Sequence, residues 1–251
     1  MQDNAFTMRT QSSLGRALSL LDCFTPERSE FTVRELAARS GIPRSTTPRL
    51  VAELLDWGAL ERGARGVRIG TRLFELGALA PAHATLREAA SPSLHALAEV
   101  TRLTANLAIR EGRHILYIDK IAAPDLAVPH SRLGGRGALH ATALGKAMLA
   151  QASPWEVDEA LIGPLRAVTA HTITDPGALR EQLATIRRTG IAYDLEESRP
   201  GLFCVASAVR GRDGRAIAAV SVTGATALDQ AERFASTVLA TARTIERSVR
   251  D

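Results

Sequence analysis

The chain has 251 residues, of which 45% are hydrophobic and 23% are charged, and it carries a formal net charge of +4. This length is enough for two ordinary domains, and the composition excludes fibrous and disordered proteins. The sequence has no apolar run long enough to cross a membrane, no leader pattern, and no metal-ligand or disulfide spacing at its two cysteines, Cys23 and Cys204. We therefore expect a cytoplasmic protein with no membrane partner, no metal and no cofactor.

The first quarter of the chain has the pattern of a winged helix-turn-helix. A first amphipathic helix is predicted from Ser13 to Phe24, and two more follow in the stretch 33–60, where Gly41 supplies the turn between them. Two short helices joined by a few residues including glycine are typical of DNA-binding proteins, in which the second helix enters the major groove. The stretch 59–70 then predicts two short strands around a Gly-Ala-Arg-Gly loop, which forms the wing.

The start of the second helix of this pair is predicted to contact DNA. Pro48 fits the helix if Ser45 is the N-cap, and it fits better if Thr47 is the N-cap and Pro48 is the first helical residue. Free N–H groups at a helix N-terminus point toward phosphates, and arginine suits phosphate and guanine contacts. We expect the following residues to contact DNA: Arg34, Arg44, Ser45, Thr46, Thr47, Arg49, Arg62, Arg65 and Arg68.

Two observations keep a structural alternative open. Pairs of helices with a glycine turn also occur in helical domains that do not bind DNA. The abundance of arginine, with lysine only at Lys120 and Lys146, is explained by a GC-rich genome as well as by DNA binding. The basic wing favours the DNA-binding interpretation.

A linker helix is predicted after the wing, because residues 71–80 are apolar at helical spacing. A further helix is expected from Ser93 to Val100, after Pro92. The predicted organisation is a DNA-binding domain at 1–70, a linker helix at 71–84 and a second domain at 85–251.

The second half of the chain alternates strands and helices in a pattern that predicts a largely antiparallel α+β domain. A hairpin is expected over 103–121, with its turn at Glu111-Gly112. Thr142 is the candidate N-cap of a helix from Ala143 to Gln151, and another helix is predicted between Asp175-Pro176 and Gly190. Strands are predicted at 191–195, 202–209 and 215–223, before a long final helix.

The last hairpin brings small polar side chains onto one face of the predicted sheet. A two-residue turn at Asp213-Gly214 sets Cys204 opposite Thr223, whereas a four-residue loop sets Cys204 opposite Ser221. Both registers place Cys204, Ser221 and Thr223 on the same face, and a three-residue loop does not. Asp194, on the preceding strand, is a further candidate for this face.

Three interpretations of this face are open from the residues alone. It is a plain sheet face, a nucleophilic enzyme site in which His140 or His171 activates Cys204, or a pocket for a small anionic ligand. No recognised motif supports the enzyme, and an apolar strand usually holds an inert cysteine. The pocket gains backbone N–H donors from the helix that starts near Ala143.

These segments together resemble the IclR family of bacterial transcriptional regulators. The resemblance runs from Leu14 to about Thr223 and rests on the stretches LGRALSLLDCF, ELAARSGIPRSTTPRL, IGTRLFELG, LHATALGKAMLA, TITDPGALREQLATIRRTGIAYDLEES and GLFCVASAVRGRDGRAIAAVSVTG. It implies a winged helix-turn-helix, a linker helix and a GAF/PAS-like effector-binding domain in which helices flank a curved antiparallel sheet. It also implies dimers, often paired into tetramers, on operator DNA.

The resemblance further implies an effector pocket, whose residues correspond here to Thr142, Ala143, Leu144, Gly145, Asp194, Cys204, Ser221 and Thr223. Many relatives have Gly-Ala in place of Ala143-Leu144 and serine in place of Thr223, so Leu144 is expected to narrow this pocket or make it less polar. Asp194 is expected to accept a hydrogen bond from a ligand hydroxyl or to orient a donor. Pro48 replaces a non-proline residue of many relatives, so their base specificity is not transferred.

We therefore expect a ligand-responsive transcriptional regulator that binds double-stranded operator DNA as a dimer or tetramer, with its affinity modulated by a small organic, carboxylic acid. The alternatives are an enzyme for a small molecule fused to a DNA-binding module, and an architectural DNA-binding protein that responds to no ligand. An enzyme consumes its ligand, whereas a regulator only binds it. The linker-helix residues Leu73, Phe74 and Leu76 are the candidate contact between two DNA-binding domains.

Overall fold

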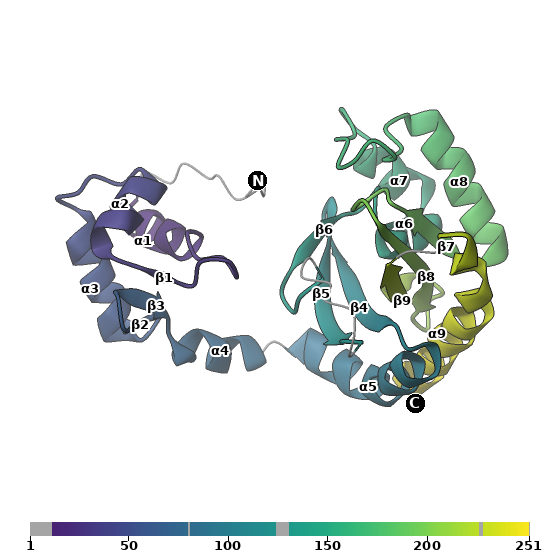
Figure 1. The fold of residues 1–251 in the computed structure, drawn as a ribbon, viewed down its shortest axis with the longest axis horizontal. Coiled ribbons are helices and arrows are strands. Elements are labelled where there is room, and N and C mark those ends of the chain that lie inside the picture. The colour runs from purple at the N-terminus through teal and green to yellow at the C-terminus, as the bar shows by residue number, and fades with distance from the viewer. Residues whose placement is uncertain (1–11, 80, 124–130, 226–227, 251) are drawn as a thin grey trace. The chain divides into compact units, whose positions relative to one another are not determined.

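The computed structural model describes residues 12–79, 81–123, 131–225 and 228–250. The chain divides into two compact units, Met1–Pro81 and Ala82–Asp251 (Figure 1). The predicted linker segment 71–84 therefore spans the division between the units. Each unit has its own hydrophobic core.

The first unit contains a helix-turn-helix followed by a wing, as the sequence predicts. Its elements are α1 (Ser13–Leu21), β1 (Glu30–Phe31), α2 (Val33–Ser40), α3 (Thr47–Trp57), β2 (Leu60–Arg62), β3 (Val67–Ile69) and α4 (Thr71–Ala78). Leu20, Leu36 and Leu50 are fully buried where the first three helices meet. Gly41 ends α2 with a φ of +72°, which a residue with a side chain rarely adopts. The glycine therefore sets the angle at which α3 leaves the turn.

Local geometry in the first unit differs from the prediction at two places. The first helix ends at Leu21 rather than Phe24, because the amides of Cys23 and Phe24 bond carbonyls only three residues back and tighten the chain into a turn. Strand β1 was not predicted; it pairs with β3 and makes the wing a three-stranded sheet. Two residues are too few to show a strand pattern in a sequence.

The start of α3 also differs from both predicted caps. The N-cap is Thr46, and it makes no side-chain capping bond. Thr47 is the first helical residue, because its hydroxyl donates back to the Pro43 carbonyl oxygen at 3.1 Å instead of capping the helix. Pro48 follows within the first turn, where its missing N–H costs little.

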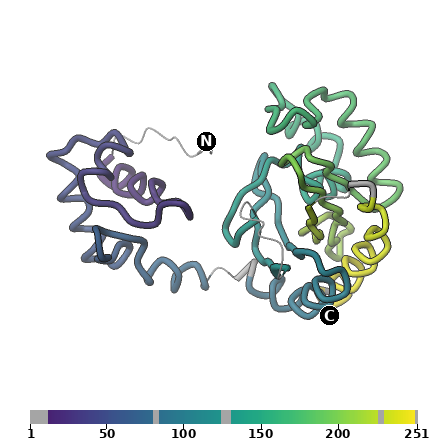
Figure 2. The backbone as a smooth tube through the Cα atoms, viewed as in Figure 1, coloured from purple at the N-terminus to yellow at the C-terminus, as the bar shows by residue number. Residues whose placement is uncertain are grey.

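The second unit is an antiparallel sheet with helices on both faces. Its elements are α5 (Pro81–Thr101), β4 (Thr104–Glu111), β5 (His114–Ile121), β6 (Arg136–Ala138), α6 (Ala143–Ala150), α7 (Pro154–Ala160), α8 (Pro176–Thr189), β7 (Ala192–Leu195), β8 (Leu202–Arg210), β9 (Ala216–Ala225), the short 3-10 helix η1 (Leu228–Phe234) and α9 (Ala235–Arg250). The strand order is β6-β5-β4-β9-β8-β7. One face packs on α5 and α9, and the other packs on α6 and α8 (Figures 1 and 2).

Helix α5 is longer than predicted. It runs from Pro81 through Pro92 to Thr101, whereas the sequence predicts a helix that begins after Pro92. A proline inside a helix removes one hydrogen bond and costs about 3 kcal/mol. The helix nevertheless continues because Ala90 and Leu94, on either side of the proline, are fully buried against the sheet.

The register of the last hairpin is one of the two that the sequence allows, but its loop is neither of the two predicted. Cys204 lies opposite Thr223, and Ala206 lies opposite Ser221. The Gly211 amide bonds the Arg215 carbonyl oxygen at 2.9 Å, so the loop between them has three residues rather than two. A bulge next to Arg210 compensates for the extra residue and restores the register.

The other hairpin and connections also refine the prediction. The turn between β4 and β5 is one residue later than predicted, at Gly112-Arg113, because Glu111 pairs with His114. Strand β6 lies between the predicted hairpin and helix α6, in a stretch for which no strand was predicted. Helix α7, which was not predicted, begins with a capping box between Ser153 and Glu156.

Helix α6 lies against the chain that precedes it. A Cβ atom at Gly145 would lie 2.0 Å from the carbonyl oxygen of Leu139, a distance that no side chain can accept. Thr142 caps the helix as predicted, with its hydroxyl oxygen accepting from the Gly145 amide at 3.1 Å. Glycine at this position therefore fixes where the N-terminus of α6 meets the sheet.

We predict that Gly145→Ala destabilises the second unit by about 1–3 kcal/mol, because the added methyl group forces the helix away from Leu139. Chemical denaturation of the full chain measures this loss. Gly77→Ala is the matched control, since Gly77 is also helical and an added methyl group there would have no atom within 4 Å; there alanine is expected to stabilise the helix by up to about 1 kcal/mol. Unchanged stability of the Gly145→Ala variant would contradict the close approach.

Candidate functional site

The predicted DNA-contact residues of the first unit are mostly exposed. Arg34 on α2, Arg44 and Ser45 in the turn, and Arg49 on α3 all face solvent, and so do Arg62, Arg65 and Arg68 of the wing. Thr46 is half-buried. Thr47 differs from the prediction because it is fully buried and its hydroxyl is bonded to the preceding turn, so its side chain is not available to DNA.

Two of these arginines form ion pairs that DNA could replace. Arg49 contacts Glu53 at 2.6 Å, one turn along α3, and Arg68 contacts Glu61 at 2.6 Å across the wing. All four side chains are more than a third exposed. Exposed pairs of this kind contribute about 0–1 kcal/mol, so exchanging either carboxylate for a phosphate costs little.

The wing loop is held by a carboxylate that sequence reasoning missed. Glu30 on β1 accepts hydrogen bonds from the backbone amides of Arg65 and Gly66. A Cβ atom at Gly66 would lie 2.1 Å from the Phe31 carbonyl oxygen, so the loop can pack here only with glycine. The position of the wing therefore depends on β1, which the sequence did not predict.

In the second unit, strand pairing places the predicted polar residues on the face that α6 covers. Asp194, Cys204 and Thr223 pair directly across β7, β8 and β9, and Thr223 pairs onward with Thr104 on β4. The next row contains Ser221 on β9 and its partner Asn106 on β4. Each of these six residues is at most 9% exposed, so this group of polar side chains, which we call the polar face, is buried.

Only part of the polar face is satisfied by hydrogen bonds. Thr223 Oγ1 lies 3.2 Å from Cys204 Sγ and accepts from Asn106 Nδ2 at 3.3 Å, and Thr104 accepts from the Ala123 amide at 3.1 Å. Ser221 Oγ and Asn106 Oδ1 have no partner among the described residues. Unpaired buried polar atoms are uncommon in folded proteins, so these two point to a missing partner.

The N-terminus of α6 adds two further unpaired groups. The amide of Gly145 bonds the Thr142 side chain, and that of Lys146 bonds the Thr142 carbonyl oxygen. The amides of Ala143 and Leu144 precede the first helical bond, and neither has a partner among the described residues. Both residues are at most 3% exposed and pack in the same core cluster as Cys204. Buried N–H groups at a helix N-terminus are well suited to an anion.

Asp194 is bonded to the turn that follows β7. Its carboxylate accepts from the amides of Glu197 and Ser198, at 2.8 and 3.1 Å, and from the Ser198 hydroxyl. Burial raises the pKa of Asp194, although these hydrogen bonds and Lys146 act in the opposite direction. These bonds make Asp194 order the turn after β7, and its contact with a ligand hydroxyl or donor stays a prediction.

A buried ion pair next to Asp194 was also missed from the sequence. Lys146 on α6 bonds Glu197, and both residues are buried. Burial raises the pKa of Glu197, while the attraction of Lys146 lowers it. Separating the two residues, or removing one of them, would leave an uncompensated buried charge. The pair therefore holds α6 against the turn after β7.

The geometry does not support a cysteine enzyme. Burial raises the pKa of the Cys204 thiol far above its usual range, so the thiol is neutral at pH 7. His140 Nε2 bonds the Arg166 carbonyl oxygen at 3.0 Å, and His171 lies 3.6 Å from Glu196. Among the described residues, neither histidine is bonded to Cys204, and no cluster of His, Cys, Asp and Glu could hold a metal.

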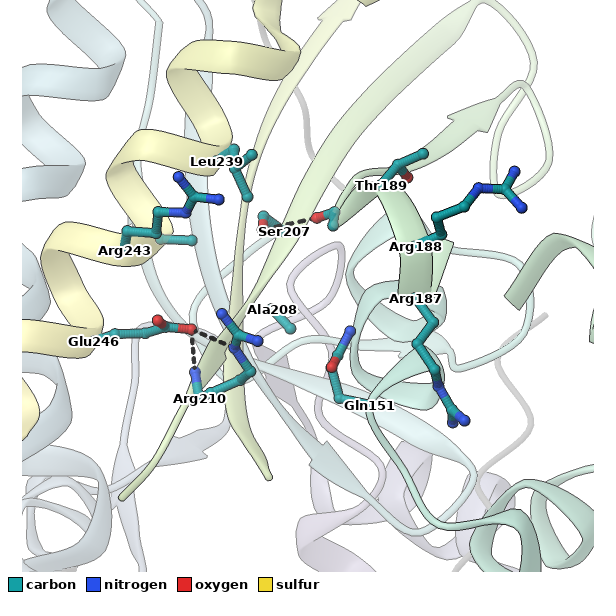
Figure 3. Close-up of a pocket in the computed structure, with 12 residues that line it drawn as sticks. Gln151, Arg187, Arg188, Thr189, Ser207, Ala208, Arg210, Leu239, Arg243 and Glu246 are labelled. Carbon is teal, nitrogen blue, oxygen red and sulfur yellow. Dashed lines mark hydrogen bonds and ion pairs between the residues drawn. The ribbon is translucent and has the colours of Figure 1, made fainter. Parts of the chain in front are cut away.

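A hollow of about 150 Å³ lies elsewhere, between the end of α8, strand β8 and helix α9 (Figure 3). Its charged lining residues are Arg187, Arg188, Arg210, Arg243 and Glu246. Arg210 is bonded to Glu246 at 2.9 Å, as the dashed lines in Figure 3 show, and Arg187 donates to two backbone carbonyls. The predicted effector residues do not line this hollow. The polar face is kept as the candidate ligand site because Ser221 Oγ and Asn106 Oδ1 are buried there without a partner among the described residues.

Comparison with known families matches both units. The model described as "IclR helix-turn-helix domain" matches residues 13–64, and the one described as "Bacterial transcriptional regulator IclR C-terminal" matches residues 79–247. Curated relatives include the HTH-type transcriptional regulator BhcR of Paracoccus denitrificans, which is 36% identical over 85% of this chain and 77% of its own length. The transcriptional repressor IclR of Escherichia coli is 32% identical over 84% of this chain and 79% of its own length.

Solved structures are similar over nearly the whole chain. An IclR homolog from Microbacterium hydrocarbonoxydans, crystallised with 4-hydroxybenzoate, has a TM-score of 0.87 and 31% sequence identity, and the match covers 95% of this chain and 99% of that one. The IclR protein of Thermotoga maritima has a TM-score of 0.79 and 28% identity over 94% of this chain and 98% of its own. Within the described residues, no helix is both long enough and apolar enough to span a membrane.

Proposed function

Because the chain belongs to the IclR family of bacterial transcriptional regulators, we propose that a small organic acid bound at the polar face controls how tightly the first unit binds operator DNA. The family assignment from the sequence is confirmed, and so is the α+β fold with its winged helix-turn-helix. The relatives are regulators and not enzymes, which agrees with the neutral, buried Cys204 thiol. We further propose that the protein acts in the cytoplasm, where its DNA target lies.

The observation that carries the proposal is the set of buried donors without partners. The amides of Ala143 and Leu144 and the hydroxyl of Ser221 are three groups that a carboxylate could bond. Each one costs about 1–3 kcal/mol while it stays unpaired, so a ligand that pairs them recovers that free energy. The Microbacterium homolog crystallised with 4-hydroxybenzoate, which is also an organic acid, supports this class of effector.

We propose that Arg49 contacts the operator and predict that Arg49→Ala weakens operator binding by about 1–3 kcal/mol without unfolding the protein. Gel-shift titration against operator and unrelated DNA measures the loss. A loss confined to the operator indicates a base contact, and a uniform loss with a reduced salt dependence indicates a phosphate contact.

Arg180→Ala is the matched control for Arg49→Ala. Arg180 forms an equally short ion pair with Asp158, at 2.6 Å, and is similarly exposed, but it lies in the second unit. This control is expected to leave DNA affinity unchanged. Undiminished operator affinity of the Arg49→Ala variant would remove Arg49 from the interface.

We propose that Ser221 contacts the effector and predict that Ser221→Ala weakens the effect of the acid on DNA binding by about 1–3 kcal/mol. The acid is first selected by thermal shift from a panel of small organic acids, since a ligand at 100 times its Kd stabilises the fold by about 2.7 kcal/mol. Operator titrations with and without that acid then give its effect. DNA affinity without the acid is expected to stay the same.

The control for Ser221→Ala is Ser207→Ala. Ser207 is also a buried serine, but it lies on β8 and its hydroxyl donates to the Gly190 carbonyl oxygen. This variant is expected to lose some stability and to keep the full ligand response. The proposal fails if the response survives both Ser221→Ala and Thr223→Val.

We propose that the protein binds DNA as a dimer or tetramer, with α4 as one contact between copies. Phe74 is 75% exposed and Leu76 is 44% exposed. Leu73 packs partly against the core of the first unit, so Phe74 and Leu76 are the side chains more available to a second copy. Sedimentation at micromolar concentration is expected to show a dimer or tetramer, and Phe74→Glu is expected to shift the distribution toward smaller species. A wild-type monomer under these conditions would contradict the proposal.

A further inference from the structure

Two unpaired atoms of the polar face lie directly across from each other on neighbouring strands. Asn106 on β4 is the register partner of Ser221 on β9, and each residue is 1% exposed. Ser221 Oγ and Asn106 Oδ1 are both without a hydrogen-bond partner among the described residues. A ligand in this site therefore meets two unpaired groups side by side and not one.

Asn106 Oδ1 and Ser221 Oγ require different ligand atoms as partners. The amide nitrogen of Asn106 donates to Thr223 Oγ1 at 3.3 Å, so its oxygen remains as a group that can only accept. Ser221 carries a hydroxyl that can donate, as can the amides of Ala143 and Leu144. A carboxylate satisfies the donors, and a hydroxyl hydrogen is needed to satisfy Asn106.

The spacing of the strands limits how far apart these ligand groups can be. Directly paired residues on adjacent antiparallel strands have Cβ atoms about 4.5–5.5 Å apart. Asparagine and serine have short side chains, so their polar atoms stay near this spacing. A ligand that bonds both residues therefore carries its hydroxyl and its carboxylate close together, as on neighbouring carbons.

We propose that Asn106 selects for a hydroxyl group next to the carboxylate, so that the effectors of this site are 2-hydroxy acids. This inference rests on the proposed function and names its class of ligand. Asn106 is suited to the role because it offers an uncharged acceptor, which does not repel a carboxylate. Asp194 is less suited to this role, because it already accepts three hydrogen bonds from Glu197 and Ser198 and because an ionised carboxylate would repel that of the ligand.

The proposal excludes two related classes of acid as preferred ligands. A simple carboxylate leaves Asn106 Oδ1 unpaired in a buried site. A hydroxyl at the far end of an aromatic ring, as in 4-hydroxybenzoate, does not reach Asn106 while the carboxylate stays on Ser221. The three classes can be compared in matched pairs that differ by one hydroxyl.

Isothermal titration of the full chain with three such pairs tests the inference. The pairs are propionate with lactate, phenylacetate with mandelate, and benzoate with 4-hydroxybenzoate. In the first two pairs the hydroxylated acid is expected to bind at least about tenfold tighter, which corresponds to one buried hydrogen bond. In the third pair the hydroxyl is expected to give no gain.

Variants then assign the preference to Asn106. Asn106→Leu keeps the branched shape of the side chain and removes the acceptor, so lactate and propionate are expected to bind about equally. Ser221→Ala is expected to weaken both acids by the same factor, because it acts on the carboxylate. Thr223→Val removes the hydrogen bond to Asn106 Nδ2 while leaving Oδ1 in place, and it is expected to retain the preference. Ser207→Ala, on the other face, is expected to change neither affinity.

Equal binding of lactate and propionate to the wild-type chain overturns the inference, and so does a preference that survives Asn106→Leu. Binding of none of the six acids at millimolar concentration also overturns it. If the acids shift operator affinity without a hydroxyl preference, the inference fails and the proposed function stands. If lactate binds with the preference but leaves operator affinity unchanged, the proposed regulation fails and the assignment of Asn106 stands.

Discussion

The pairing of β9 with both β4 and β8 is the constraint on which the candidate site depends. Strand β9 pairs Ser221 with Asn106 of β4 and Thr223 with Cys204 of β8. All four side chains therefore lie on the face under α6. A shift of one residue in either pairing would turn half of these groups toward α5 and α9. The bulge next to Arg210 is important for this reason. It compensates for the third residue of the loop, so that Cys204 still pairs with Thr223.

Helix α6 completes the site because three interactions hold its N-terminus in place. Gly145 allows contact with the Leu139 backbone, Thr142 caps the first turn, and Lys146 is paired with Glu197. The cap uses the amide of Gly145, and in the described part of the chain the amides of the buried residues Ala143 and Leu144 have no partner. A donor set that is already in place loses little conformational entropy when a ligand binds, which favours affinity for a small anion.

Features that depend on residues close together in the chain could be predicted from the sequence, and contacts between distant residues could not. The helix-turn-helix and the caps at Thr142 and Asp175 follow from neighbouring residues, and the structure contains them. The last hairpin has one of the two registers that the sequence allows. Asn106, Lys146 and Glu197 were missed because each meets its partner across a long stretch of chain. Only the pairing of β4 with β9 places Asn106 beside Ser221. Thr47 and Pro92 were misjudged because tertiary burial outweighed the local preference of each residue.

The central claim is that the unpaired donors at the polar face bind the carboxylate of an effector. NMR spectra of the full chain with 15N-labelled alanine and leucine report on the Ala143 and Leu144 amides directly. The account predicts that both resonances move downfield as lactate is added, because each amide gains a hydrogen bond, while alanine and leucine amides of the first unit that are already bonded within helices stay in place. Saturable binding of lactate with no movement of the Ala143 and Leu144 resonances would contradict the claim.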